Sequence, residues 1–243
     1  MAKKSERTRQ LVLDTALRLF REEGYAATTM RRVATEAGLS PSNAYYYFAG
    51  KDELVQELYR QLQVEHREVA APGIREGARL ETNLAHVLHR GLDTNAPYHG
   101  FGSTMLSAAL TPGSPVNPFG PDQVEAREAA IGLMADVVRA SSGVPGGSVG
   151  ERLPYLLWLV YMGVTLFWVL DSSPEQQRTR TLVDGAAPLL SRVLRLSRLP
   201  VGRGLTEDAL GLMDRLAGGA AGSAGSAGSA GSAGSRGSRG EHA

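Results

Sequence analysis

Signals that stop and start helices lie unusually close together near the N-terminus, and they constrain the fold more than any other feature of the chain. Gly24 and Gly38 each follow an amphipathic stretch and can adopt the backbone conformation that ends a helix. Ser40 can cap a new helix, and Pro41 fits its first position because its φ angle is already helical. Between Gly24 and Phe48 there is room only for two short helices joined by a tight turn.

Apolar periodicity supports three helices in this region. A first helix over residues 5–23 is predicted by apolar residues that recur every three and four positions, namely Leu13, Ala16, Leu17 and Phe20. A second has Thr28 or Thr29 as its N-cap and a shorter apolar stripe, namely Met30, Val33, Ala34 and Ala37. A third is expected over residues 41–48. The two short helices form a helix-turn-helix, whose second helix enters the major groove of DNA.

The residue types on the third helix suit DNA recognition. Ala44, Tyr47 and Phe48 are expected to pack inward, which leaves a more exposed set of Ser42, Asn43, Tyr45 and Tyr46. An asparagine can pair with adenine through two hydrogen bonds, and tyrosine hydroxyls can donate to phosphate. Arg31, Arg32 and Lys51 place positive charge nearby. The alternative is that the three tyrosines form a packed aromatic turn and that the arginines belong to a solvated surface.

The segment resembles the signature of the TetR family of transcriptional regulators. The resemblance runs over residues 15–54 and is carried mainly by TMRRVA at 29–34, AGLS at 37–40, YYYF at 45–48 and Lys51. It implies that Tyr47 and Lys51 contact phosphate and that eight other residues face DNA, namely Thr29, Arg31, Ser40, Pro41, Ser42, Asn43, Tyr45 and Tyr46. Family members often have glycine where this chain has Ser42 and a larger aliphatic residue where it has Ala44. These departures concern base preference rather than the fold.

No convincing strand pattern occurs, so the chain is expected to be all-α, with a three-helix DNA-binding domain followed by a helical ligand-binding and dimerisation domain. We place the domains at residues 1–50 and 51–216, followed by a disordered Ala-Gly-Ser tail at 217–243. Further helices are predicted at 51–71, 79–92, 101–110, 122–140 and 153–170. A last helix, opened by a capping box at 173–176, is expected to run toward Leu199 with a kink at Pro188.

Residues 153–170 carry no charge, and as a helix they would be roughly 27 Å long, which is borderline for crossing a membrane. The flanking Glu151 and Asp171 are acidic rather than basic anchors, and Pro154 lies in the first turn. A membrane anchor remains an alternative, but a buried helix in a core or subunit interface fits better. Because the chain has no cysteine, which suits a reduced cytoplasm, we expect a cytoplasmic protein, and we expect no membrane among its partners. The net charge of +1 does not by itself indicate a nucleic-acid binder, so DNA binding would have to come from a local patch.

The family resemblance implies a homodimer in which two helices of each subunit meet their copies. The residues expected in this interface are Leu157, Val160, Val164, Phe167, Val183, Ala186, Leu189, Leu190 and Val193. A two-fold dimer predicts a double-stranded DNA operator that is an inverted repeat.

The second domain is expected to bind a small lipophilic effector that releases the protein from DNA. Its predicted lining is His86, His89, Tyr98, His99, Phe101, Met105, Phe119, Met134, Trp158 and Met162. Of these, His86, His89 or His99 are expected to be the polar groups that orient the ligand. The alternative is a DNA-binding dimer without an effector, whose second domain serves only dimerisation or protein contacts. An apolar pocket would favour the first reading.

Motifs for catalysis are weak. Residues 146–150 match Gly-x-Ser-x-Gly, but a nucleophile elbow requires a strand before the serine, and none is predicted. His86 and His89 are spaced to share a metal, yet no third ligand accompanies them. We therefore expect no enzyme, no cofactor and no metal site.

Overall fold

The computed structural model describes residues 2–111 and 113–196, and these residues pack as one unit. Apart from one isolated bridge between Arg79 and Ser142, their regular secondary structure is helical, which confirms the all-α prediction. The predicted end of the last helix near Leu199, the end of the second domain at 216 and the tail at 217–243 lie outside the described residues.

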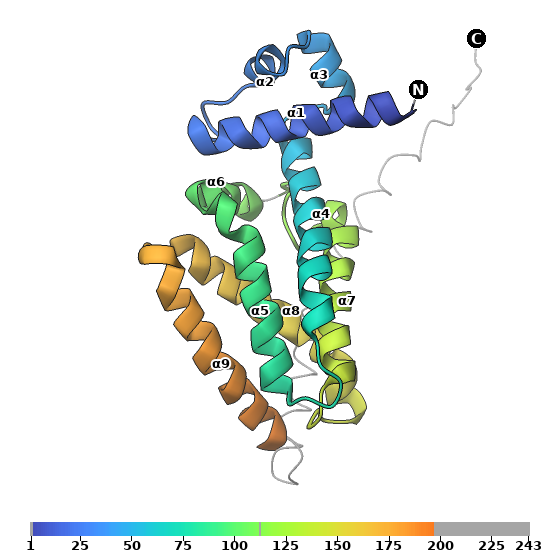
Figure 1. Ribbon diagram of the computed structural model, residues 1–243, viewed down its shortest axis with the longest axis vertical. Coiled ribbons are helices and arrows are strands. Elements are labelled where there is room, and N and C mark those ends of the chain that lie inside the picture. Colours follow the sequence, from blue (N-terminus) through green and yellow to red (C-terminus); the bar gives the residue numbers. More distant parts are fainter. Residues whose placement is uncertain (1, 112, 197–243) are drawn as a thin grey trace, which may run out of the picture. The chain divides into compact units, whose positions relative to one another are not determined.

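The N-terminal helices follow the predicted order, with α2 and α3 on one side of α1 (Figure 1). They are α1 (Ala2–Glu22), α2 (Met30–Glu36) and α3 (Pro41–Tyr47). Gly24 and Gly38 adopt φ angles of 87° and 68°, the left-handed region that lets the chain leave a helix sharply. Thr29 caps α2, whereas the Thr28 hydroxyl donates to the carbonyl of Gly24 and holds the preceding loop.

The remaining helices form a second bundle. They are α4 (Lys51–Ala70), α5 (Leu80–Asn95), α6 (His99–Leu110), α7 (Val124–Ala140), α8 (Gly147–Leu170) and α9 (Gln177–Leu196). Helix α4 extends from the three N-terminal helices and packs between α5 and α7, while α8 packs on α7 and α9 on α5 (Figure 1). Helix α8 begins at Gly147 rather than at residue 153, because the absence of charged residues identifies only the apolar part of the helix. Helix α9 continues through Pro188.

The start of α9 differs from the predicted capping box. Asp171 takes the capping role: its Oδ2 accepts hydrogen bonds from the backbone N–H and the hydroxyl of Thr179, at 2.8 and 2.7 Å. The Ser173 hydroxyl accepts from the backbone N–H of Arg178 and donates to Asp171. Burial alone would raise the pKa of Asp171, but these hydrogen bonds outweigh it and lower the pKa below its usual range.

Two apolar clusters make up the core, and the first crosses the predicted domain boundary. Phe20 of α1 packs edge-on against Phe101 of α6, with ring centroids 6.0 Å apart. Both rings are buried. Helix α1 is thus in direct contact with α6 as well as with α4.

A buried carboxylate also joins α1 to α4. Glu57 accepts hydrogen bonds from Arg9 at 3.0 Å, from Arg60 at 2.6 Å and from Gln61 at 3.1 Å. Burial would raise the pKa of Glu57, but the bonds from Arg60 and Arg9 outweigh it and lower the pKa to about 2. The carboxylate therefore stays charged in the folded protein at pH values where it would be protonated in the unfolded chain.

This difference predicts a pH-dependent contribution to stability. Because the folded pKa is depressed, the Glu57 contribution is fully present above the unfolded value near 4.3 and is lost as the pH falls toward about 2. Allowing for solvent screening, we expect Glu57→Gln to lower the free energy of unfolding at pH 7 by roughly 1–2 kcal/mol. Chemical denaturation between pH 3 and pH 7 measures this, and a variant with the same pH slope as the wild type would contradict the assignment.

Candidate nucleic-acid interface and effector cavity

Helix α3 presents a polar and aromatic surface on a fixed backbone. The Ser40 hydroxyl accepts from the backbone N–H of Asn43 at 3.2 Å, and Pro41 occupies the first turn. Ala44 and Phe48 are fully buried, as predicted, and hold the helix against α1. This packing fixes which side of the short helix faces outward.

The outward side contains the predicted base-reading residues. Tyr45 and Tyr46 are 50% and 78% exposed, and Ser42 and Asn43 are also exposed. Among the described residues, the Asn43 side chain has no hydrogen-bonding partner. Its amide is free to offer the donor and acceptor pair that matches an adenine edge.

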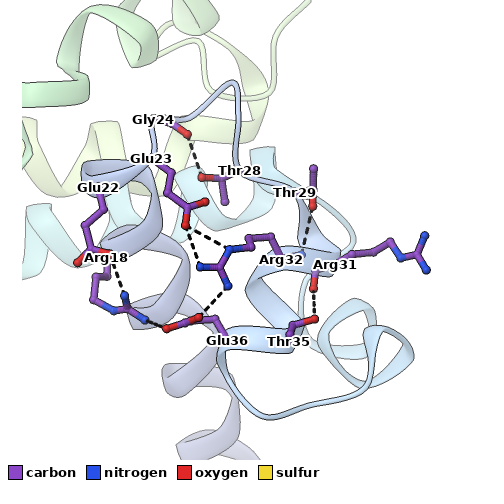
Figure 2. A network of polar contacts seen from close by, with 10 residues as sticks. All are labelled: Arg18, Glu22, Glu23, Gly24, Thr28, Thr29, Arg31, Arg32, Thr35 and Glu36. Atoms are coloured by element: carbon purple, nitrogen blue, oxygen red, sulfur yellow. Dashed lines mark hydrogen bonds and ion pairs between the residues drawn. The ribbon is translucent and has the colours of Figure 1, made fainter.

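The two neighbouring arginines of α2 have different surroundings (Figure 2). Arg32 forms ion pairs with Glu23 at 2.9 Å and with Glu36 at 2.7 Å, and Arg18 of α1 also pairs with Glu36 at 2.7 Å. Arg31 points away from this network, and no described residue pairs with its guanidinium. The structure therefore places Arg32 in a network of ion pairs that connects α2 with α1 and the residue after it. Arg31 stays available for a phosphate contact.

The two predicted phosphate contacts are partly engaged within the protein. The Lys51 ammonium donates to the backbone carbonyl of Tyr25 at 2.7 Å and lies 4.3 Å from the centre of the Tyr25 ring. Tyr47 is half-buried and packs edge-on against Tyr46, with centroids 5.1 Å apart. Lysine has three donors, so the bond to Tyr25 orients Lys51 and leaves donors for a phosphate.

A large cavity lies among the helices of the second bundle. Its volume is about 340 Å³, within the range of small-molecule sites. Helix α4, the end of α5, η2 (Ala96–Tyr98), α6, the loop 117–119 and α8 form its wall. Four residues predicted for the pocket line it, namely Tyr98, Met105, Phe119 and Met162.

The structure does not bring the other six predicted residues into this cavity. Phe101 and Met134 are buried in the two apolar clusters, and Trp158 lines an adjoining void of about 30 Å³. The Nε2 atoms of three histidines have other partners: the carbonyl of Ala70 for His86, Asp184 for His89 and the carbonyl of Trp168 for His99. The sequence predicts that histidines orient the ligand. The position of each histidine around its helix axis instead directs its ring to these other partners.

The polar part of the cavity wall was missed by the sequence analysis. It consists of Tyr59, Gln63, Asn95, Asn117, Tyr161 and Thr165. Tyr59 and Gln63 share one face of α4 by their four-residue spacing, which is the only signal that the sequence offers. That spacing does not say whether the face points to solvent or to a cavity.

A chain of ring contacts connects the cavity to the DNA-binding helices. Tyr98 lines the cavity and packs edge-on against Phe101, whose ring contacts Phe20 of α1. The Arg21 guanidinium lies 5.7 Å from the centre of the Tyr98 ring. A ligand that displaces Tyr98 would therefore press directly on α1.

Helices α8 and α9 leave apolar side chains exposed. On α8 these are Leu166, Phe167 and Leu170, and on α9 they are Leu182, Leu189 and Val193. Of the nine predicted interface residues, Phe167, Leu189 and Val193 are exposed, whereas Leu157, Val164 and Val183 are buried inside the subunit. Val160, Ala186 and Leu190 are half-buried. The predicted set thus mixes surface and core positions.

Helix α8 is long and apolar enough to cross a membrane by length and composition, and a third of its most apolar window is buried. A single helix of this kind is weak evidence for a membrane span, because core helices of soluble proteins have the same length and composition.

Neither weak catalytic motif has a supporting geometry. Ser148 lies in the first turn of α8, and no strand precedes it among the described residues. His86 and His89 contact separate partners, and the described part of the chain contains no group of three potential metal ligands.

The comparisons with known proteins cover both halves of the chain. Residues 12–58 match the family described as "Bacterial regulatory proteins, tetR family", and residues 83–210 match "Tetracyclin repressor-like, C-terminal domain". The HTH-type transcriptional repressor KstR2 of Rhodococcus jostii is 39% identical over 82 residues, which are 32% of this chain and 40% of KstR2. The HTH-type transcriptional regulator BetI of Brucella abortus is 34% identical over 85 residues, 32% of this chain and 43% of BetI. The similarity thus spans about two fifths of these curated relatives.

Solved structures share the fold at low identity. The FadR transcriptional regulator of Bacillus subtilis, solved in complex with stearoyl-CoA, has a TM-score of 0.57 and 17% identity, covering 73% of this chain and 96% of FadR. A TetR transcriptional regulator of Nitrosomonas europaea has a TM-score of 0.55 and 20% identity, covering 74% of this chain and 96% of that protein. At these identities the likeness concerns the fold alone.

Proposed function

The chain belongs to the TetR family of transcriptional regulators, and we propose that it is a cytoplasmic repressor that binds an inverted-repeat operator as a dimer and leaves it when a lipophilic ligand binds. The exposed surface of α3 and the free guanidinium of Arg31 support the DNA contact. The exposed apolar residues of α8 and α9 support a second copy as the partner, because soluble monomers rarely leave such a surface uncovered.

One observation carries the ligand-dependent part of the proposal. The cavity shares Tyr98 with the ring contacts that reach Phe20 of α1, so ligand binding and the position of the DNA-binding helices have a physical connection. Helix α4 offers a second connection, since it begins at Lys51 beside the DNA-binding helices and lines the cavity with Tyr59 and Gln63. Two recognition helices must lie roughly 34–36 Å apart, or at a multiple, to enter successive major grooves together, so a small shift prevents docking.

A regulator without an effector is the second candidate. The contacts of His86, His89 and His99 favour this second candidate. Nε2 of each histidine already has another partner, so the cavity lacks the groups that the sequence predicts for orienting a ligand. The size of the cavity favours the ligand-responsive function.

The linkage between ligand and operator provides the test. A ligand that releases DNA must prefer the DNA-free conformation, so operator DNA should weaken ligand binding by the factor by which the ligand weakens operator binding, typically about 5–150-fold. Ligands are titrated calorimetrically against the protein with and without operator. Leu106 lines the cavity, and Leu106→Trp should fill part of it with a larger side chain. This variant should retain operator binding and lose the ligand response. A ligand that binds the cavity tightly, and with the same affinity in the presence and absence of operator DNA, would refute the release mechanism.

A further inference from the structure

The cavity wall contains no ionisable charge. None of its described lining residues is Asp, Glu, Lys, Arg or His. Three tyrosines line it. Burial raises the pKa of Tyr59 to about 12 and also raises the pKa of Tyr98 and of Tyr161, although Arg21 opposes the shift of Tyr98 and hydrogen bonds oppose that of Tyr161. All three phenols are therefore neutral at physiological pH.

Three polar groups of the wall contact the side chain of a fourth, Tyr161. Asn95 Nδ2 donates to the hydroxyl of Tyr161 at 3.3 Å, and Gln63 and Thr165 also interact with the Tyr161 side chain. The amides of Asn95 and Gln63 each have two N–H donors and one carbonyl acceptor, more than this cluster uses. The rest of the wall is largely apolar, with Met105, Leu106 and Trp168 among its residues.

An anionic group would have no counterion among the described residues that line this cavity. Moving a carboxylate or phosphate out of water costs several kcal/mol unless a cation pairs with it, whereas a neutral hydroxyl or amide needs only hydrogen bonds. Arg127 lines the adjoining 30 Å³ void rather than the cavity itself, and its Nη1 donates to the carbonyls of Pro118 and Gly120.

We propose that the effector is an uncharged lipophilic molecule with one hydrogen-bonding group, an alcohol, ketone or amide, that lies against the cluster of Gln63, Asn95 and Tyr161. This inference rests on the proposed ligand-responsive function. It predicts that carboxylates and CoA thioesters bind more weakly than a neutral molecule with the same alkyl chain.

The test uses four probes that share one alkyl chain: dodecan-1-ol, dodecanamide, dodecanoate and dodecanoyl-CoA. Competition against a neutral fluorescent dye measures their affinities for the full chain. The alcohol and the amide should bind at least about tenfold more tightly than the two anions, because only the anions lose hydration without a counterion. Tighter binding of either anion, or no binding of any probe, would overturn the proposal.

A charge placed in the wall provides a second measurement. Gln63→Lys should shift the preference toward dodecanoate by at least about tenfold. Val64→Lys is the matched control, since it adds the same charge at the next position of α4, where the side chain is exposed and outside the cavity wall, and it should leave the preference unchanged. If Gln63→Lys does not fold, Gln63→Leu should weaken dodecan-1-ol binding but not dodecane binding. Unchanged selectivity in a folded Gln63→Lys protein, or equal losses for alcohol and alkane in Gln63→Leu, would contradict the assigned cluster.

The same probes are then added to the protein bound to its operator. Release by the neutral probes supports both the ligand class and the repressor mechanism. Selective binding of neutral probes without release supports the ligand class and contradicts the mechanism. Release by dodecanoyl-CoA but not by dodecan-1-ol supports the mechanism and overturns the ligand class.

Discussion

Glutamate in place of Leu189 is expected to separate the proposed dimer into folded monomers. Leu189 is 59% exposed on α9, and Leu182 and Val193 lie on the same side of that helix. In a two-fold interface the substitution places a charge in both copies and removes it from water without a partner. We expect the dissociation constant of the dimer to rise by roughly a hundredfold or more, a change of at least about 3 kcal/mol.

Sedimentation at several concentrations measures this change, and circular dichroism shows that the monomers stay folded. Thr181→Glu is the matched control, because it adds the same charge to another exposed side of α9, where Thr181 bonds only to the carbonyl of Gln177. The monomeric variant should also lose cooperative operator binding, since one subunit reaches only one half-site. If Leu189→Glu remains a dimer, the interface lies elsewhere on the subunit.

The choice of Leu189 rather than Val164 illustrates what the sequence could not determine. Both residues belong to apolar stripes of the predicted interface, but Val164 is buried within its own subunit at 4% exposure. A charge at Val164 would damage the core and unfold the protein without testing the dimer. Helical periodicity defines the apolar side of a helix, whereas the packing of α5, α7 and α8 decides which part of that side remains uncovered.

Local signals near the N-terminus were predicted well because neighbouring residues alone determine them. The cap at Ser40 and the left-handed conformations of Gly24 and Gly38 depend on contacts within a few turns of chain. They are enough to identify the helix-turn-helix.

Contacts over long sequence separations were not predicted. Arg32 pairs with Glu23 across the turn between α1 and α2, and nothing in the two adjacent arginines indicates which of them does so. In the cavity wall, Asn95 and Tyr161 are 66 positions apart, and their contact follows from the packing of α5 on α8. Composition therefore indicated a lipophilic ligand but not the uncharged polar cluster.

Removing the Asn43 side chain is expected to weaken operator binding about 5–150-fold while leaving the fold intact. The amide is exposed and has no partner among the described residues, so Asn43→Ala should not change the melting temperature. The loss of a two-bond contact with a base costs roughly 1–3 kcal/mol and appears only with the specific operator. Tyr45→Ala should behave in the same way, because Tyr45 is half-exposed on the same helix.

Fluorescence anisotropy with the operator and with an unrelated duplex, at several salt concentrations, separates base contacts from phosphate contacts. Arg31→Ala should weaken binding to both duplexes alike and reduce the slope of log affinity against log salt by about one. Arg32→Ala is the matched comparison: it removes the same charge at the next position, and it should mainly loosen the ion pairs with Glu23 and Glu36. Operator binding by Asn43→Ala and Tyr45→Ala at wild-type affinity would show that another surface reads the DNA. A larger loss of salt dependence in folded Arg32→Ala than in Arg31→Ala would show that the ion pairs of Arg32 open on DNA and that Arg32 makes the phosphate contact.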